Sequence, residues 1–184
     1  MSRRLLPNII ITGTPGCGKT SHSEQLAEVA GLKHIAVSDF AKKNGCIDGF
    51  DEERDTAIVD EDKLLDEIEP LAEKGGIIID WHCCEIFPER LIDLVVVLRC
   101  NNTVLYDRLK KRGYKDNKIS ENVEAEIMEV LLQEAKDSYA QEIVVELNSE
   151  DIDYLEQNVE RISQWIDNWK NDHPEGVSNE LSSD

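Results

Sequence analysis

The sequence lacks the features that mark disulfide-bonded, secreted or membrane-spanning proteins. Its five cysteines are odd in number and include no C-x-x-C pair, so neither a disulfide framework nor a zinc site is indicated. The apolar run near the start, 9–11, is too short for the core of a secretory signal, and no segment approaches the length of a transmembrane helix. We therefore expect a soluble, intracellular protein with no membrane partner.

Basic residues are scarce as well. The 184-residue chain has 20 lysines and arginines against 39 aspartates and glutamates, which gives a formal net charge of -19. Because such a surface repels phosphate backbones, strong direct binding of nucleic acid is not expected, whereas a basic protein partner would be attracted. A small anionic ligand would need positive groups concentrated at one place in the fold.

What is present suits one globular domain. Hydrophobic residues make up 40% of the chain, enough to bury a core at this length. Short apolar segments alternate with segments of helical spacing. The predicted strands are 8–12, 32–37, 77–80, 94–98 and 143–147. The predicted helices are 21–30, 39–43 (capped by Ser38), 64–71, 103–111, 123–139 and 152–169, whereas 44–59 has no clear periodicity.

The alternation of strands and helices predicts an α/β fold. Five apolar strands separated by helices form a parallel sheet that is covered by helices on both faces. We expect this domain over residues 1–172. Residues 173–184 are acidic, contain no lysine or arginine and have few apolar side chains, so they are expected to form a disordered tail.

The most specific motif follows the first predicted strand. Residues 13–20 read GTPGCGKT and match the P-loop pattern G-x-x-x-x-G-K-[ST] at every fixed position. In such a loop, backbone N–H groups turn onto phosphate oxygens, and the helix that follows adds its positive end. Lys19 is expected to reach the β and γ phosphates of ATP, and the Thr20 hydroxyl to ligate Mg²⁺. Cys17 is interpreted as a small filler residue, with a redox role as the alternative.

The third predicted strand ends at Asp80, with His82 two residues further on. Ligands in such sheets bind beyond the carboxyl ends of strands. Asp80 could therefore hold Mg²⁺ through water, and His82, on the same face of an extended chain, could orient an attacking water or sense the γ phosphate. The alternatives are a helix-capping aspartate and a histidine that merely packs.

Three arginines are candidates for clamping a transferring phosphoryl group. Arg108 and Arg112 lie four residues apart on one helical face, and Arg112 stands where the helix breaks and a lid could begin. Arg90 is the third candidate. For Arg108 and Arg112 the alternative is a solvated helix arginine.

Together these segments resemble the adenylate kinase isoenzyme six family, also called CINAP-type nucleotide kinases. The resemblance covers 7 to about 174. It is carried by PNIIITGTPGCGKT, VSDFAK, DGFDEERD, VDEDK, IIIDWH, FPERLIDLVVVLR, LYDRLKKRGY and SYAQEIVVEL. It implies a P-loop, nucleoside-monophosphate-kinase-like fold with a monophosphate-binding segment at about 36–59 and a lid at about 111–121.

The resemblance also implies a function. Members of this family are broad-specificity nucleoside-monophosphate (adenylate) kinases, which convert ATP and AMP to two ADP, with a slower ATPase activity. They act in maturation of the small ribosomal subunit and its pre-rRNA, where they bind an extended, basic small-subunit ribosomal protein of the pre-ribosomal particle. Nuclear and cytoplasmic locations are implied.

Matched to the motifs of the family, individual residues acquire expected roles. The residues expected to bind ATP are Gly13, Gly16, Cys17, Gly18, Lys19, Thr20, Ser21 and Arg112. The expected catalytic residues are Lys19, Asp80, His82 and Arg112, with Thr20 and Asp80 on Mg²⁺. AMP is expected at Ser38, Asp39 and Lys42.

The sequence departs from ordinary adenylate kinases in ways that leave a second function open. Lys42 stands where those enzymes have an arginine, and a lysine cannot make the two-pronged contact with phosphate. The helix after the lid contains no arginine. A weaker clamp favours looser base choice, and it admits an ATP-switch assembly factor with vestigial kinase activity, or a kinase for another metabolite. The stretch 48–69 contains eleven acidic residues against Arg54 and Lys63, a surface suited either to a basic partner or simply to solvent.

Overall fold

The main sheet carries the nucleotide-binding motif at its centre. A computed structural model of the chain describes residues 2–53 and 56–180. Five parallel strands lie in the order β3-β6-β2-β7-β8. Their bounds are Ile9–Gly13 for β2, Lys33–Ala36 for β3, Ile77–Asp80 for β6, Leu94–Arg99 for β7 and Val144–Asn148 for β8. The predicted five-stranded parallel sheet is confirmed.

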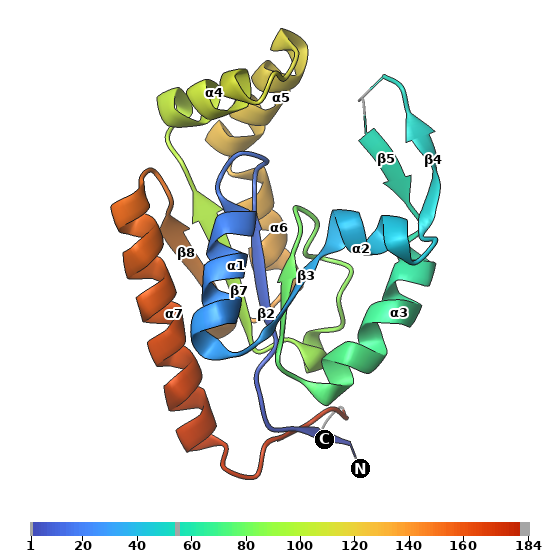
Figure 1. The fold of residues 1–184 in the computed structure, drawn as a ribbon, viewed down its shortest axis with the longest axis vertical. Helices are drawn as coiled ribbons and strands as arrows, with labels where there is room; N and C mark the ends of the chain where they lie inside the picture. Colours follow the sequence, from blue (N-terminus) through green and yellow to red (C-terminus); the bar gives the residue numbers. More distant parts are fainter. Residues whose placement is uncertain (1, 54–55, 181–184) are drawn as a thin grey trace.

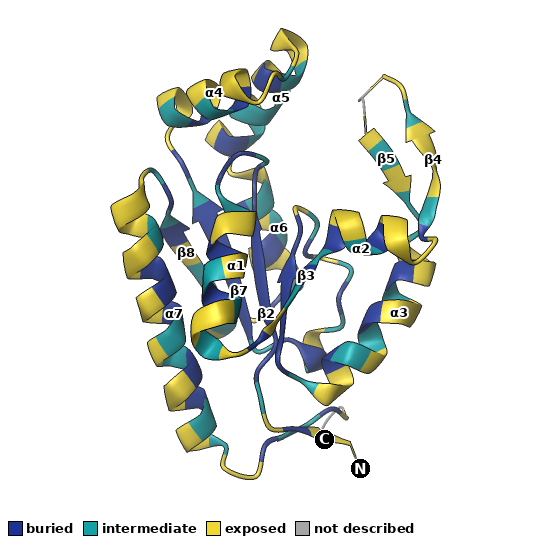
Figure 2. Ribbon diagram, in the orientation of Figure 1, coloured by how far each residue is buried: buried dark blue, intermediate teal, exposed yellow. Residues whose placement is uncertain are grey.

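Both faces of the sheet are apolar because successive side chains of a strand point to opposite sides. Ile10 packs into one core, beneath α2 (Val37–Lys43), α3 (Glu61–Lys74) and α6 (Val130–Ser138). Ile9 and Ile11 pack into the other core, beneath α1 (Lys19–Ala30) and α7 (Ile152–Asp172), which lie side by side in Figure 1. Figure 2 shows the buried strands between helices that are exposed on their outer faces. Among the described helices, none is both long and apolar enough to cross a membrane.

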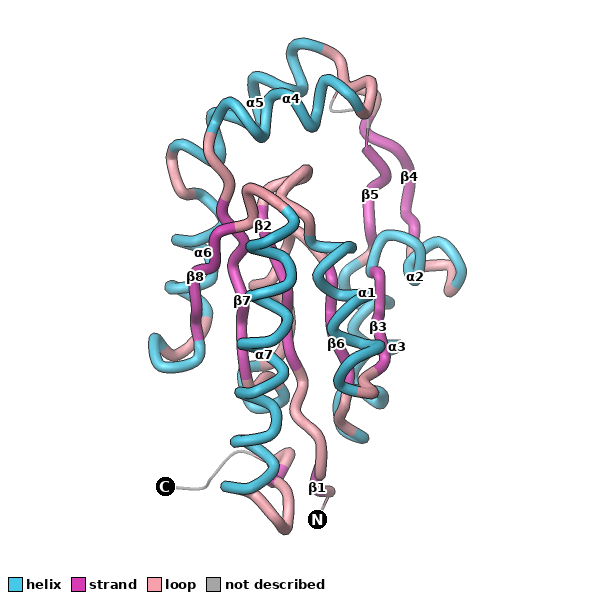
Figure 3. Tube along the Cα trace, turned by 60° about the vertical axis from the view of Figure 1, so that its left-hand side comes forward, coloured by secondary structure: helices cyan, strands magenta, loops and turns pink. Residues whose placement is uncertain are grey.

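Two pairs of elements stand beyond the carboxyl ends of the strands. One is the antiparallel hairpin of β4 (Ile47–Asp51) and β5 (Thr56–Val59), and the other is α4 (Asn102–Lys111) with α5 (Asp116–Ile127). Figures 1 and 3 show them on either side of the sheet end. The hairpin occupies the segment without clear periodicity, because most of its side chains are at least partly exposed and do not alternate between apolar and polar.

Two helix predictions are wrong in detail. The expected single helix 123–139 is two helices, because α5 ends at Ile127 and α6 begins at Val130. Between them Glu129 has a φ of 56°, a left-handed conformation that a continuous helix cannot contain. At α2, the residue before the helix is Ala36, so Ser38 lies within the first turn and is not its cap.

The expected disordered tail from residue 173 is wrong for 173–180. The strand β9 (Val177–Ser178) pairs antiparallel with β1 (Arg3–Arg4) at the other end of the chain. The buried Arg4 side chain donates to Asn179 Oδ1 at 2.6 Å and makes a two-pronged contact with Asp93, at 2.6 and 3.0 Å. These hydrogen bonds hold the segment, and composition alone gave no sign of them. Residues 181–184 lie outside the described part of the chain.

Candidate functional site

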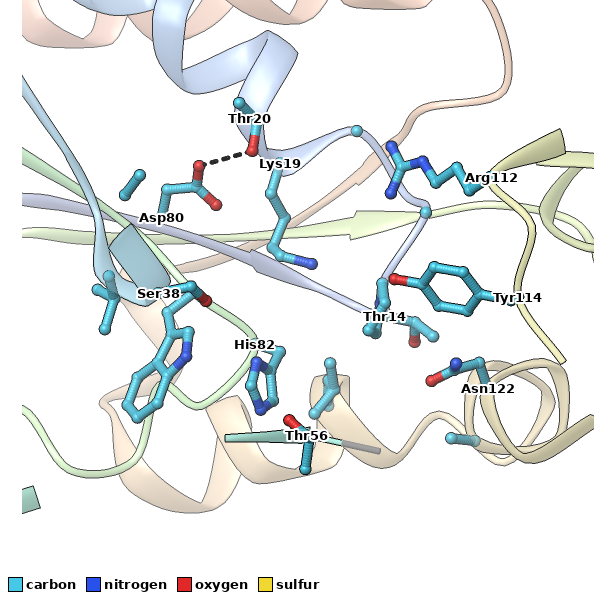
Figure 4. A pocket seen from close by; sticks show the side chains of 18 of the residues that line it. Thr14, Lys19, Thr20, Ser38, Thr56, Asp80, His82, Arg112, Tyr114 and Asn122 are labelled. Atoms are coloured by element: carbon cyan, nitrogen blue, oxygen red, sulfur yellow. Dashed lines mark hydrogen bonds between the residues drawn. The ribbon is translucent and has the colours of Figure 1, made fainter. Parts of the chain in front are cut away.

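A pocket of about 550 Å³ lies beyond the carboxyl ends of β2 and β6. Its walls come from the P-loop, the start of α2, the segment after β6, the hairpin and α5. Figure 4 shows Lys19 near the centre, between Asp80 and Arg112, with His82 and Thr56 across from it. Residues that the sequence separates by tens of positions therefore share one cavity.

The P-loop depends on glycine at two positions. Gly16 and Gly18 have φ values of 97° and 88°, which L side chains rarely adopt. A Cβ at Gly16 would also lie 2.9 Å from Leu105 and 3.0 Å from Leu109, both on α4. The glycines of the motif thus let the loop turn tightly against α4 and leave its backbone accessible to a phosphate.

Lys19 lies across the P-loop. Its Nζ donates a hydrogen bond to the Gly13 carbonyl oxygen at 2.9 Å, and the side chain lines the pocket. Burial lowers the pKa of the Lys19 ammonium, an effect that the nearby Asp80 carboxylate opposes. Lys19 and Gly13 are therefore together, as expected, and the role of Lys19 on ATP phosphates stays a prediction.

The two residues predicted to hold Mg²⁺ are in direct contact. Thr20 Oγ1 donates to Asp80 Oδ2 at 3.0 Å, which links the start of α1 to the end of β6. The same oxygen, Oδ2, is 2.9 Å from Nε2 of His34 on β3. Asp80 is thus buried at the edge of the pocket and does not cap a helix. No motif in the sequence pointed to His34.

His82 stands at the boundary between the central pocket and a second hollow of about 600 Å³. Its ring packs edge-on against Trp81, with the centroids 5.3 Å apart, yet the residue remains exposed. Partial desolvation, with the Lys19 charge as a second contribution, lowers the pKa of His82. A neutral imidazole that lines this pocket can accept a hydrogen bond from water.

The three candidate arginines have different surroundings. Arg112 lines the pocket as predicted. Arg108 donates to the carbonyl oxygens of Gly16, Ser149 and Glu150 at 3.2, 2.7 and 2.8 Å, so it joins the P-loop to the loop after β8 and is not a freely solvated helix arginine. Arg90 donates to the Asn179 carbonyl oxygen, away from the pocket.

The residues predicted for AMP divide between the two hollows. Ser38 and Asp39 line the central pocket, whereas Lys42 lines only the second one. The second hollow has apolar walls from the hairpin, notably Phe50 and Ile58.

A third hollow, of about 440 Å³, lies on the opposite side of the P-loop. Ser21 and Arg112 line it together with Lys111, Ile152 and Leu155. Arg112 therefore stands between this hollow and the central pocket, whereas Ser21 faces the third hollow alone.

Cys17 turns its side chain away from the pocket. Its Sγ donates to Glu126 Oε2 on α5 at 2.9 Å, and the residue is fully buried. A hydrogen bond with Cys100, burial and the Glu126 charge all raise the pKa of the Cys17 thiol. Because the thiolate is the reactive form, this favours the filler interpretation over a redox role. Only the backbone of Cys17 could meet ATP.

A second histidine that the sequence analysis did not identify, His22, contacts the backbone of the P-loop. His22 is buried, with Nδ1 2.8 Å from the Gly18 carbonyl oxygen. Asn158 Nδ2 lies 3.2 Å from its Nε2 and donates to it, so the hydrogen is assigned to Nδ1. Burial lowers the pKa of His22, which suits this neutral form.

The segment where the lid was expected, at about 111–121, and the turn of α5 that follows it contribute polar residues that motif reasoning missed. Lys118 and Asn122, one turn apart on α5, line the pocket, and Lys118 Nζ lies 5.2 Å from the centre of the Tyr114 ring. Their spacing of four residues would have indicated a shared helical face. However, the sequence does not show which face of this helix lines the pocket.

The fold and this site define a P-loop kinase. Shikimate kinase from Acinetobacter baumannii in complex with shikimate superposes with a TM-score of 0.59 at 20% identity, over 90% of this chain and 95% of that one. YorR protein from Bacillus subtilis gives a TM-score of 0.60 at 16% identity, over 89% and 98%. A family model described as an AAA domain (AAA_18) matches residues 9–129.

Relatives with higher sequence identity show to which family of P-loop kinases the chain belongs. The adenylate kinase isoenzyme 6 homolog of Candida albicans is 59% identical over 99% of this chain and 77% of its own length. The homolog of Saccharomyces cerevisiae is 56% identical over 97% and 91%, and that of Schizosaccharomyces pombe 55% over 92% and 97%. The chain belongs to the adenylate kinase isoenzyme 6 family. The predicted family is confirmed, and it is a family of nucleotide kinases that use ATP.

Proposed function

We propose that this protein is a broad-specificity adenylate kinase that transfers the γ phosphate of ATP to AMP. The observation that carries this proposal is the convergence of Lys19, Asp80, His82 and Arg112 on one pocket with a further hollow on each side. Phosphoryl transfer needs positioning and charge stabilisation more than a protein nucleophile, and these residues supply both.

The two side hollows suit the two nucleotides. The base of ATP would lie in the hollow of Arg112, Ile152 and Leu155, which adjoins the P-loop. The acceptor would lie in the hollow of Phe50, Ile58 and Trp81, with its phosphate toward His82. Apolar walls hold any base by burial and stacking, which supports broad acceptor choice. The phosphate to be transferred would then be next to Lys19.

The donor set is compatible with Mg²⁺. Thr20 offers a hydroxyl and Asp80 a carboxylate, both oxygen ligands of the kind this ion prefers. Mg²⁺ at nucleotide sites is usually held by one or two protein side chains together with phosphate oxygens and water, so these two groups would suffice. When bound, Mg²⁺ would neutralise charge on the phosphates, while Thr20 and Asp80 fix its position.

We further propose a slower ATPase activity and a role in small-subunit maturation. In the absence of AMP, water could occupy the acceptor side, and His82 would orient it. The acids of the hairpin and α3, such as Asp48, Glu52, Asp62 and Glu67, are exposed and form a surface that would attract a basic ribosomal protein. Nuclear and cytoplasmic locations belong to this proposal. The alternative is an ATP-driven assembly factor in which kinase activity is vestigial.

The test measures ADP formed from ATP and AMP beside phosphate released from ATP alone, each with and without a basic small-subunit ribosomal protein. Two matched variants test the hollows. Phe50→Ser should raise KM for AMP and spare KM for ATP, and Ile152→Ser should do the reverse. A protein that releases phosphate but forms no ADP from AMP would favour the assembly factor. Absence of both reactions, with the fold intact, would contradict the proposal.

A further inference from the structure

Asp80 is held from two sides at the same oxygen. Oδ2 lies 3.0 Å from Thr20 Oγ1 on α1 and 2.9 Å from His34 Nε2 on β3. The side chains of His34 and Asp80 are only 16% and 5% exposed, so water competes little for this contact. An ionised carboxylate only accepts hydrogen bonds, so Nε2 of His34 is assigned the hydrogen.

The register of the sheet explains how a histidine on the edge strand reaches this site. In the parallel pairing of β3 with β6, Ala36 is opposite Asp80 and His34 is opposite Ile78. Residues two apart on a strand share a face, so His34, Ala36 and Asp80 all lie on the α1 side of the sheet. Because the Ala36 side chain is a single methyl group, the imidazole of His34 can extend past it to the carboxylate.

The other oxygen of Asp80 is left for the pocket. Among the described residues, Oδ1 makes no hydrogen bond, and Figure 4 shows it on the side of Asp80 that faces Lys19. With two donors on Oδ2, rotation of the carboxylate would break both contacts. The orientation of Oδ1 is therefore fixed before any nucleotide binds.

From this geometry we infer that His34 is a positioning residue, which holds Asp80 so that Oδ1 faces the Mg²⁺ of bound Mg·ATP. The inference rests on the proposed function, since it concerns the metal that accompanies ATP. Hydrogen-bond partners of metal-binding groups orient those groups and raise metal affinity. A histidine with a merely structural role would change the stability of the fold but not the dependence of nucleotide binding on Mg²⁺.

The experiment compares three variants with the unaltered protein. His34→Leu removes the donor and keeps most of the volume, whereas His34→Gln retains an N–H group at similar reach. Lys33→Ala is the control, an exposed residue on the same strand. Calorimetry gives the affinity for ATP with Mg²⁺ and with a chelator, and the Mg²⁺ concentration for half-maximal ADP formation is measured separately. Metal-free ATP binding also reports that each variant is folded.

His34→Leu should weaken Mg·ATP binding about ten-fold, raise the Mg²⁺ requirement similarly and leave metal-free ATP binding unchanged. His34→Gln should recover most of the loss, and Lys33→Ala should match the unaltered protein. The inference is overturned if His34→Leu has an unchanged Mg²⁺ requirement, loses affinity equally with and without metal, or is no worse than His34→Gln. Failure of the unaltered protein to form ADP would instead overturn the proposed function.

Discussion

The two walls of the central pocket differ in how they are supported. On one wall, Lys19 at the start of α1 and Asp80 at the end of β6 are held by contacts within the domain. On the other, Thr56 and Asn122 belong to the hairpin and to α5, which stand beyond the sheet and are largely exposed (Figure 2). Under the proposed function, phosphate binding would rely on the core, whereas acceptor choice would rely on exposed elements that can shift without disturbing the sheet.

The largest effect should come from the supported wall. Lys19→Ala removes the cation at the centre of the pocket, and loss of such a contact should raise the barrier by roughly 3 kcal/mol or more. We expect at least about a hundred-fold loss of both ADP formation and ATP hydrolysis, with an unchanged thermal unfolding curve. Turnover close to that of the unaltered protein, in a folded variant, would contradict the assignment of the P-loop.

His82, which lies between the central pocket and the second hollow, should affect ATP hydrolysis and phosphoryl transfer differently. His82→Gly should reduce ATP hydrolysis at least about ten-fold, because an unoriented water seldom meets the phosphate in line. Transfer to AMP should fall much less, because a bound acceptor is oriented by its own contacts. Both rates are measured on one preparation. An equal loss of the two activities would identify His82 as a packing residue.

The same contrast decides what the sequence could predict. The P-loop and the strand that ends at Asp80 are contiguous patterns, so Gly16, Lys19, Thr20 and Asp80 could be found and brought together. His34 could not be found, because its contact with Asp80 depends on the register of β3 against β6. The hairpin, Lys118 and Asn122 could not be predicted, because exposed segments are not constrained to a periodic apolar pattern.

At the ends of the chain the sequence pattern was misleading for a similar reason. Residues 173–180 have the composition of a disordered tail, yet Asn179 is buried against Arg4. The partner lies at the opposite end of the sequence, so no local pattern could reveal it. Arg108 was likewise a candidate for clamping a phosphoryl group because of its position on the helix. In the structure it donates hydrogen bonds to three carbonyl oxygens, which the sequence could not show.

On the exposed wall, the proposed basic partner gives a moderate, salt-dependent effect. Glu52→Lys with Glu53→Lys reverses two exposed charges of the hairpin. Association with a basic small-subunit ribosomal protein should slow several-fold at low salt, where charges steer the partner over long distances. The effect should shrink at physiological ionic strength, where screening limits steering to about 8 Å. ATP binding, on the other wall, should be unaffected.

The matched control is Glu156→Lys with Glu160→Lys, the same charge change on exposed positions of α7. Association rates are compared across a salt series. If both pairs of substitutions slow association equally, net charge alone steers the partner and the hairpin is not its site. If association does not depend on salt, the acidic surface is only solvated.

The smallest effect concerns two places where the backbone has a positive φ. In the P-loop these residues are the glycines Gly16 and Gly18, whereas at the junction of α5 and α6 Glu129 has a φ of 56°. A non-glycine residue in this region costs about 1–2 kcal/mol. Its ion pair with Arg99, at 3.7 Å and with the Glu129 side chain 61% exposed, offsets little of that cost.

Glu129→Gly should therefore stabilise the fold, although less than the full strain. Glycine also gains conformational freedom in the unfolded chain, which costs about 0.5–1 kcal/mol. We expect the free energy of unfolding in urea to rise by up to about 1 kcal/mol, with an unchanged slope. Glu129→Ala, which loses the ion pair and keeps the strain, should be neutral or slightly destabilising. If Glu129→Gly is no more stable than Glu129→Ala, then the junction of α5 and α6 stores no backbone strain.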